Sequence, residues 1–158
     1  MNIRVGFGFD IHQLVEGREL WLGGIRLEHE KGLLGMSDAD VLIHAICDAL
    51  FGAASMGDIG THFLETDTRN EGIDSKILLK DAVNLITAKG YSIGNVDSII
   101  CAERPKINPH VFAMKEVLSK IMNISIDDVS IKASTNEKLG YVGREEGICA
   151  YATVLIYK

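Results

Sequence analysis

The sequence has little of what marks disulfide-linked or membrane-embedded proteins. Only three cysteines and two prolines occur among 158 residues, and aromatic residues make up 6%. The cysteines, Cys47, Cys101 and Cys149, lie far apart and form no C-x-x-C pair. We therefore expect the three cysteines to be small buried apolar side chains, and we predict neither a disulfide framework nor a closed structural zinc site. No apolar run reaches the roughly 18 residues that a membrane-spanning helix requires, so no membrane partner is predicted.

The sequence also lacks an excess of positive charge. Lysine and arginine number 16 against 22 aspartate and glutamate residues, which gives a formal net charge of −6. This balance argues against a nucleic-acid partner. An anionic substrate would need positive charge placed locally, by metal ions or by a few lysines and arginines. The stretch MNIRVGFGFD contains no charged-then-apolar leader, so we predict a cytoplasmic protein.

The composition of the whole sequence, 47% hydrophobic and 24% charged, is typical of a soluble globular protein. No internal repeat or linker interrupts the chain, and its length suits a single domain covering residues 1–158. Segments rich in Ile, Val, Leu and Tyr predict strands at Ile3–Asp10, Glu19–Leu27, Ser92–Ala102, Val129–Thr135 and Ile148–Tyr157.

Three helices are predicted from apolar positions at helical spacing. The first begins at the sequence SDAD, where Ser37 opens an S-x-x-D capping box. The second covers Asp74–Lys89 and stops at Gly90. The third has Asn108 as its cap and Pro109 at its first position. Helices interleaved with strands predict an α+β fold: a single mixed β-sheet with helices packed on one face.

Two histidines and an aspartate suggest a metal centre. Asp10 and His12 are two residues apart on a predicted strand, so their side chains point the same way if the strand persists. His44 lies in the first helix, with Asp48 one turn later. Taken singly, His44 could pair with Asp48, and Asp10 could form a strand-end turn. Taken together, Asp10, His12 and His44 leave a fourth position open, as catalytic zinc sites do.

Three polar loops could hold a phosphorylated ligand. GAASMGDIGTHFLETD combines flexible glycines with carboxylates, although alone it equally suits a surface loop. AERPKINPH places Arg104 and Lys106 at a helix start, where backbone amides bind phosphate. IKASTNEKLGYVGREEG offers hydroxyls, cations and the Glu137 carboxylate, which suits magnesium.

Four segments resemble the motifs of the 2-C-methyl-D-erythritol 2,4-cyclodiphosphate synthase family, a zinc-dependent lyase family of non-mevalonate isoprenoid biosynthesis. They are GFGFDIHQL, GLLGMSDADVLIHAICDALFGAASMGDIGTHF, KGYSIGNVDSIICAERPK and KASTNEKLGYVGREEG. The resemblance covers essentially the whole chain, in order. It implies a homotrimer with active sites between neighbouring subunits. It also implies the substrate 4-diphosphocytidyl-2-C-methyl-D-erythritol 2-phosphate, which cyclises with release of CMP.

The resemblance also implies roles for particular residues. Zinc would bind Asp10, His12 and His44, and Glu137 would hold a second divalent ion, magnesium or manganese. Thr135, Glu137 and position 36, here Met36, would be catalytic. The erythritol-phosphate side would comprise Asp58, Ile59, Gly60, Phe63, Leu64, Glu65, Thr66 and Asp67. The cytidine pocket would comprise Ala102, Glu103, Arg104, Pro105, Lys106, Ile107, Asn108, Ser134 and Thr135. Further substrate contacts would be Asp10, His12, Met36, Ser37, Asn136, Glu137, Tyr141 and Arg144, the last of which could instead face the trimer axis.

The chain departs from the family pattern at two places. Met36-Ser37-Asp38 stands where the family usually has His-Ser-Asp, and Phe63-Leu64-Glu65 stands where Phe-Pro-Asp is common. The second change keeps a carboxylate, but the first removes a hydrogen-bond donor, since a thioether has none. Two alternatives therefore stay open. One is a zinc-dependent phosphohydrolase of a nucleoside diphosphate derivative, with water as nucleophile. The other, favoured by Met36, is a catalytically impaired trimeric binding protein.

Overall fold

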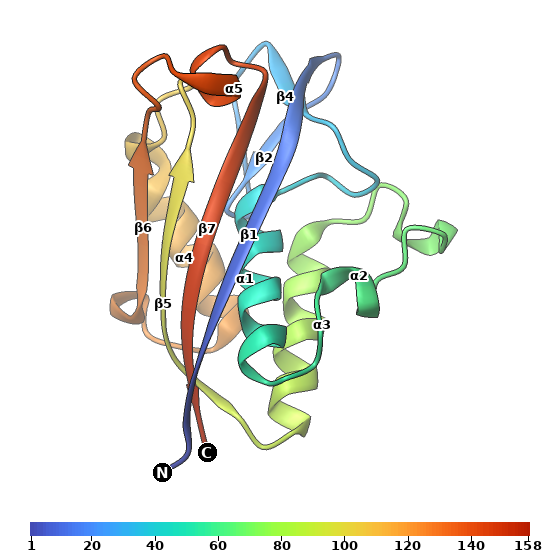
Figure 1. Cartoon of the computed structure of the whole chain (residues 1–158), viewed down its shortest axis with the longest axis vertical. Coiled ribbons are helices and arrows are strands. Elements are labelled where there is room, and N and C mark those ends of the chain that lie inside the picture. The colour runs from blue at the N-terminus through green and yellow to red at the C-terminus, as the bar shows by residue number, and fades with distance from the viewer.

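A computed structural model describes residues 1–158 as a mixed β-sheet with packed helices (Figure 1). The five-stranded sheet has the order β4-β1-β7-β5-β6. Its strands are β1 (Ile3–Glu16), β4 (Lys31–Leu33), β5 (Ser92–Cys101), β6 (Val129–Ser134) and β7 (Gly147–Tyr157). A separate hairpin is formed by β2 (Leu20–Leu22) and β3 (Ile25–Leu27). The α-helices are α1 (Val41–Ala53), α2 (Ile59–His62), α3 (Ser75–Ala88), α4 (Val111–Met122) and α5 (Gly140–Gly143). Short 3-10 turns occupy Thr68–Asn70, Asn108–His110 and Ile126–Asp128.

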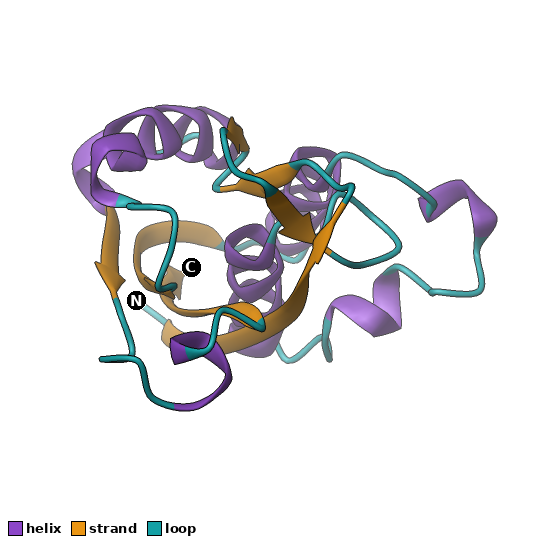
Figure 2. Cartoon of the chain, turned by 90° about the horizontal axis from the view of Figure 1, so that it is seen from above, coloured by secondary structure: helices purple, strands orange, loops and turns teal.

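The sheet mixes antiparallel and parallel pairing. β1 and β7 form a long antiparallel ladder from Ile3↔Tyr157 to Gln13↔Gly147. β5 is antiparallel to β7 and parallel to β6, and Figure 2 shows that the sheet curves instead of lying flat. The chain ends meet at one end of this ladder, where Asn2 and Lys158 exchange two backbone hydrogen bonds of 2.7 and 3.1 Å. The predicted α+β fold with a mixed sheet is confirmed.

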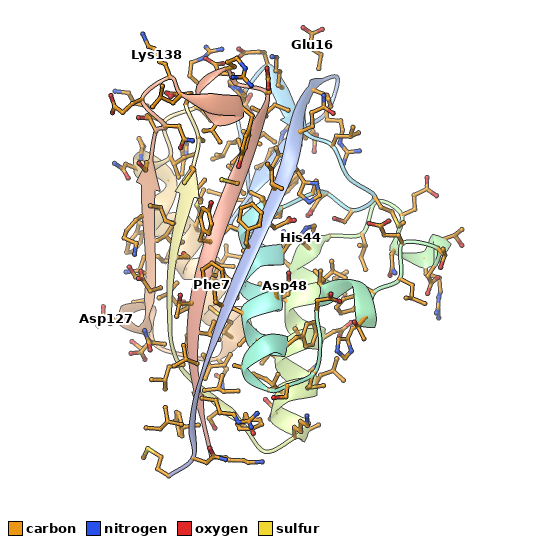
Figure 3. All side chains as sticks on the ribbon, viewed as in Figure 1. Phe7, Glu16, His44, Asp48, Asp127 and Lys138 are labelled. Atoms are coloured by element: carbon orange, nitrogen blue, oxygen red, sulfur yellow. The ribbon has the colours of Figure 1, made fainter.

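The core lies between the sheet and α1. Eleven of the 13 residues of α1 are buried, because the helix contacts β1 and β7 on one side and α3 on the other. Gly6 and Gly8 of β1 lie directly under α1, whereas the alternate side chains of β1, including Val5, Phe7 and Phe9, are exposed on the opposite face. Figure 3 shows Phe7 on the face of the sheet turned toward the viewer, with the helices behind. This second face of the sheet carries no helix.

Several predicted boundaries need correction. β1 continues past Asp10 to Glu16, so His12 is also part of the strand. The single strand predicted at Glu19–Leu27 is a hairpin, because Gly23 and Gly24 both adopt positive φ and turn the chain. The strand predicted to begin at Ile148 is confirmed, starting one residue earlier.

The helix starts also differ from two of the three predictions. Ser37 does not cap α1: its hydroxyl accepts a hydrogen bond from the backbone of Ala39, whose φ of 58° interrupts the helical path. Asp40 is the cap instead, accepting from the backbone nitrogen of Ile43. Asn108 begins a 3-10 turn, and α4 starts only at Val111, without a side-chain cap.

For the second helix the prediction holds. Asp74 caps α3, and Gly90 follows the helix end with φ of 88°. Of the three free cysteines, Cys47 and Cys149 are buried as predicted, while Cys101 is only half-buried. None of the helices has the length and apolar character to cross a membrane.

Candidate metal centre

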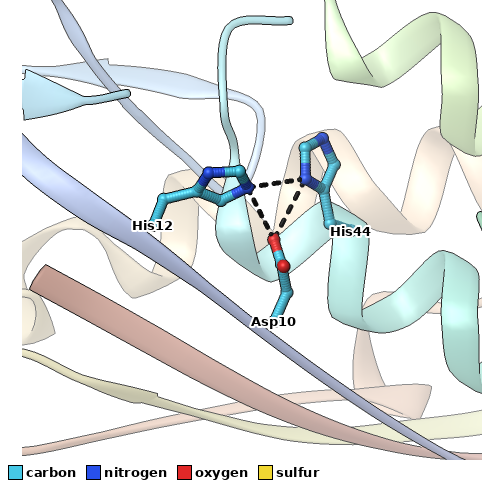
Figure 4. Close-up of side chains that lie close together, drawn as sticks. All are labelled: Asp10, His12 and His44. Atoms are coloured by element: carbon cyan, nitrogen blue, oxygen red, sulfur yellow. Dashed lines mark hydrogen bonds and ion pairs between the residues drawn. The ribbon is translucent and has the colours of Figure 1, made fainter. Parts of the chain in front are cut away.

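Three side chains converge at the junction of β1 and α1 (Figure 4). Asp10 Oδ2 lies 2.9 Å from His12 Nε2 and 3.0 Å from His44 Nδ1. The two imidazole nitrogens are 3.2 Å apart. No other group of three or more histidine, cysteine or carboxylate side chains is close enough to share a metal ion. The predicted constellation is therefore assembled in the fold.

Local structure explains the convergence. Asp10 and His12 project from the same face of β1 because side chains alternate along a strand. His44 reaches them from α1, since the helix backbone approaches β1 at two glycines. A Cβ on Gly8 would lie 1.9 Å from the carbonyl oxygen of Ala45, so only glycine permits this approach.

Each imidazole is hydrogen-bonded through the ring nitrogen that does not contact Asp10. His12 Nδ1 lies 2.8 Å from the carbonyl oxygen of Leu34, to which it donates, so a cation would be met by Nε2. His44 Nε2 lies 3.0 Å from Ser75 Oγ and 3.2 Å from Ser37 Oγ. Such contacts fix ring orientation at metal sites. Asp48, which the sequence suggested as the partner of His44, instead accepts from the backbone nitrogen of Ile59 at 2.7 Å.

The electrostatics favour an ionised carboxylate in the cluster. Burial alone would raise the pKa of Asp10, but hydrogen bonds from His12 and His44 outweigh it and lower that pKa to about 2. Burial likewise opposes protonation of His12, yet its hydrogen bond to Asp10 raises the His12 pKa. A divalent cation between these atoms would take the place of that proton.

The donor set and its spacing fit zinc. Ligand atoms of a tetrahedral zinc ion with bond lengths near 2.0 Å are about 3.3 Å apart. The three ligand atoms here, separated by 2.9, 3.0 and 3.2 Å, need only a small expansion. Two imidazoles with one carboxylate leave the fourth position for a water or substrate oxygen, as at catalytic sites.

A pocket of about 170 Å³ opens beside the cluster. It brings together the predicted residues Asp10, His12, Met36, Ser37, His44, Ile59, Gly60, Phe63 and Glu65. Sequence reasoning missed three further lining residues, Asn70, Ile73 and Leu78. It also missed Ser75 behind His44. No one-dimensional signal marks these four, because they come from the segment before α3 and from α3 itself.

Other predicted residues near this loop do not line the pocket. Asp58 caps α2 by accepting from the backbone nitrogen of Thr61 at 2.9 Å. Asp67 pairs with Arg69 at 2.6 Å. Leu64 is exposed and, like Thr66, does not line the pocket.

The predicted cytidine residues gather elsewhere, at the ends of the parallel strands β5 and β6. Arg104 pairs with Glu145 at 3.1 Å and also with Glu30. Glu103 accepts from the backbone nitrogen of Lys138 at 2.7 Å. Figure 3 places Lys138 at the upper end of the molecule, well above His44. Nothing from 102–108 or 134–144 lines the pocket beside the metal cluster.

The remaining predicted residues lie in the loop after β6, in α5 and directly after α5. Thr135 Oγ1 is 3.4 Å from Glu137 Oε1 in the loop after β6. Tyr141 lines a cavity of about 320 Å³ that His12 also lines. Arg144 pairs with Glu146, a further residue of that cavity, at 2.8 Å.

Fold and cluster together define an α+β protein with a candidate divalent-metal centre. Comparisons with known proteins point to one family. The model of the YgbB family matches residues 3–157. A Bacteroides fragilis (strain YCH46) protein named 2-C-methyl-D-erythritol 2,4-cyclodiphosphate synthase is 70% identical over 156 residues, 99% of this chain and 98% of that protein. The chain belongs to the YgbB family, and the resemblance inferred from its motifs is confirmed.

Solved structures of related proteins superpose closely on this chain. The bifunctional IspDF from Campylobacter jejuni superposes with a TM-score of 0.94 and 35% identity, over 98% of this chain and 42% of that longer one. A CDP-bound form of 2C-methyl-D-erythritol-2,4-cyclodiphosphate synthase superposes with a TM-score of 0.90 and 36% identity, over 98% of this chain and 100% of that one. These solved structures therefore share the fold over 98% of this chain.

Proposed function

We propose that this protein cyclises 4-diphosphocytidyl-2-C-methyl-D-erythritol 2-phosphate to 2-C-methyl-D-erythritol 2,4-cyclodiphosphate and releases CMP. The observation that carries this conclusion is the Asp10, His12 and His44 cluster, set beside a pocket in a chain 70% identical to a synthase of that name. In the reaction, an oxygen of the 2-phosphate bonds to the β-phosphorus. The bond from that phosphorus to the bridging oxygen of the diphosphate breaks, and CMP leaves with this oxygen.

The chain's own residues supply positioning and charge. Asp10, His12 and His44 would hold zinc, which supplies positive charge to phosphate oxygens when bound. Glu137, an exposed carboxylate beside Thr135, would anchor a magnesium or manganese ion. We assign catalytic contact to Thr135 and Glu137, and substrate contacts to the other residues that the resemblance implies.

This chemistry needs no general base. A phosphate oxygen is already an anionic nucleophile at neutral pH, and phosphoryl transfer depends mainly on alignment and charge stabilisation. Ser75, the serine nearest to His44, is fully buried and donates its hydroxyl hydrogen to Asp38, so it is not placed as a nucleophile that the histidine activates. Lys106, Lys138 and Arg144 would offset the charge of a polyanionic substrate in a protein of net charge −6.

We infer that the active unit is a homotrimer. The helix-free face of the sheet exposes Val5 and Phe7 by 65% each, Phe9 by 40% and Ile11 by 41%. Contiguous apolar surface of this kind favours association. The separation of the cytidine residues from the metal pocket within one chain also supports a site completed by a neighbouring subunit. We further propose one domain over residues 1–158, a cytoplasmic location, and neither nucleic-acid nor membrane partners.

Product analysis tests the proposed function. Incubation with the cytidyl substrate should yield CMP and the cyclic diphosphate, and a chelator should abolish both. A linear bisphosphate would instead indicate a zinc-dependent phosphohydrolase, with water as the nucleophile. Met36 favours a second candidate, a catalytically impaired binding protein, because it lines the pocket without a hydrogen-bond donor. Saturable CMP binding without turnover would identify that case.

A further inference from the structure

The rear of the His44 ring meets a buried hydroxyl that comes from a different helix. His44 Nε2 points away from Asp10 and lies 3.0 Å from Ser75 Oγ. Ser75 is fully buried at the start of α3, and its hydroxyl is also hydrogen-bonded to Asp38 Oδ1. A continuous chain of contacts therefore runs from Asp38 through Ser75 and His44 to Asp10.

The direction of each proton in this chain follows from the acceptors. Asp38 Oδ1 accepts from the backbone nitrogen of Asp40 at 3.1 Å, and Oδ2 accepts from that of Ser75 at 3.0 Å. Both oxygens act as acceptors, so the single proton of the Ser75 hydroxyl points to Asp38. Only a lone pair of Ser75 Oγ then faces His44, and Nε2 must carry a hydrogen to donate to it.

This arrangement selects one tautomer of His44. When a metal is bound, hydrogen on Nε2 leaves the lone pair of Nδ1 for that metal, in place of the contact between Nδ1 and Asp10. Ser37 Oγ cannot make the selection alone. It lies 3.2 Å from Nε2 and accepts from the backbone of Ala39, so its own proton stays free to point either way.

We propose that Ser75, with its direction set by Asp38, is a positioning residue for the metal ligand His44. The inference rests on the proposed metal centre and deepens it. It extends the carboxylate–histidine–metal arrangement of other metal sites by one hydroxyl. Helix α3 also supplies Leu78 to the pocket wall. The hydrogen bonds from Asp38 through Ser75 to His44 therefore connect this pocket-lining helix to the metal ligand on α1.

The expected effect is on metal affinity. Removing the partner behind a metal-ligating histidine typically costs about 10–100-fold in metal affinity. Ser75→Ala removes only the hydroxyl: the backbone nitrogen that donates to Asp38 stays, and so does the Asp74 cap of α3. Ser75→Thr keeps the hydroxyl and should restore affinity. Ser98→Ala is the matched control, since Ser98 is also buried and donates one hydrogen bond, to the carbonyl of Ser130 at 2.9 Å.

The test measures zinc affinity by chelator competition, together with the visible absorption bands of the cobalt-loaded protein and the melting temperature. We expect Ser75→Ala to bind zinc at least about tenfold more weakly, with altered cobalt bands, while Ser98→Ala matches the parent. Ser75→Cys, which keeps the shape but is only a weak acceptor, tests the same bond if Ser75→Ala folds poorly.

The outcomes separate the two proposals. If folded Ser75→Ala or Ser75→Cys has the zinc affinity and cobalt bands of the parent protein, the positioning role of Ser75 is overturned. Equal weakening in Ser75→Ala and Ser98→Ala would also overturn it, because the effect would then be one of general stability. A parent protein that binds no zinc would contradict the proposed metal centre itself.

Discussion

Gly8 of β1 and Ala45 of α1 are in direct backbone contact: a Cβ on Gly8 would lie 1.9 Å from the Ala45 carbonyl oxygen. Asp10 follows Gly8 by two residues, and His44 immediately precedes Ala45. The contact therefore sets the distance of 3.0 Å between the Asp10 carboxylate and the His44 ring. The absence of a side chain at position 8 is therefore a condition for the approach of His44 to Asp10.

Gly8→Ala should destabilise the protein severely. The added methyl meets backbone, which no rotamer change can move, so α1 must shift away from β1. Overpacking alone typically costs about 1–3 kcal/mol, and a backbone clash at this separation should reach the upper limit or exceed it. Denaturant unfolding measures the loss. Gly52→Ala is the control: its Cβ would be 4.0 Å from the nearest atom, and the change should be neutral or stabilising by up to about 1 kcal/mol.

His44→Ala should remove zinc from the purified protein. The variant leaves one imidazole and one carboxylate, which is too few protein ligands for a catalytic zinc site. Metal analysis per chain makes the measurement, with His110→Ala, outside the cluster, as the control that keeps its zinc. A full equivalent of zinc in His44→Ala would overturn the ligand assignment.

Glu137→Gln should leave zinc content unchanged and lower turnover strongly when magnesium is limiting. Glu137 is exposed, and its carboxylate accepts one hydrogen bond, from Thr135 Oγ1 at 3.4 Å, so the loss of charge should act on a bound ion more than on the fold. Turnover is measured against magnesium concentration, with exposed Glu116→Gln on α4 for comparison. An unchanged magnesium dependence would rule out this role.

Phe9→Lys should convert a trimer into monomers. The substitution places a charge on the helix-free face, where burial against a partner would leave the charge unpaired. Light scattering at micromolar concentration should report a trimer for the parent and a monomer for the variant. Phe112→Lys changes a side chain that is 66% exposed on α4, and this control should stay trimeric. A monomeric, active parent protein would contradict the assembly.

Met36→His should raise turnover. Met36 lines the pocket beside Asp10 and His12, and its thioether cannot donate a hydrogen bond to developing charge. A pre-aligned donor is typically worth a factor of about 10²–10³ in rate, so a gain of at least about tenfold is expected at saturating metal. Zinc content and CMP affinity should not change. If the parent already turns over well and the variant brings no gain, another group fills the role.

The ligands on β1 were predictable because their proximity depends only on strand geometry. Asp10 and His12 share a face through the two-residue period of a strand, whatever packs above them. His44 could be nominated but not placed, since its approach depends on Gly6 and Gly8 leaving room for the α1 backbone. That closeness is a property of two elements together, and neither segment alone encodes it.

The helix cap predicted at Ser37 is wrong because tertiary contacts outweigh the local capping pattern. Ser37 has the sequence of a helix cap, yet Ala39 turns with positive φ and transfers the cap to Asp40. Asp40 is fully buried and also accepts from the backbone of Gly23 and Gly24, at 3.0 and 2.7 Å, so it fastens the β2–β3 hairpin as well as capping α1. A capping box considers four consecutive residues and cannot anticipate a hairpin that uses the same carboxylate.

The pairing of Asn2 with Lys158 has a topological consequence. Both chain ends leave the molecule together at the lower end of Figure 1. Asp10 lies seven residues along β1 from Ile3, or about 23 Å at the usual rise of a strand. A second domain attached to either end would thus emerge far from the metal centre. The two ends could equally be joined by a short peptide and the ring reopened at a surface loop, giving a circular permutant with the same ladder of strands.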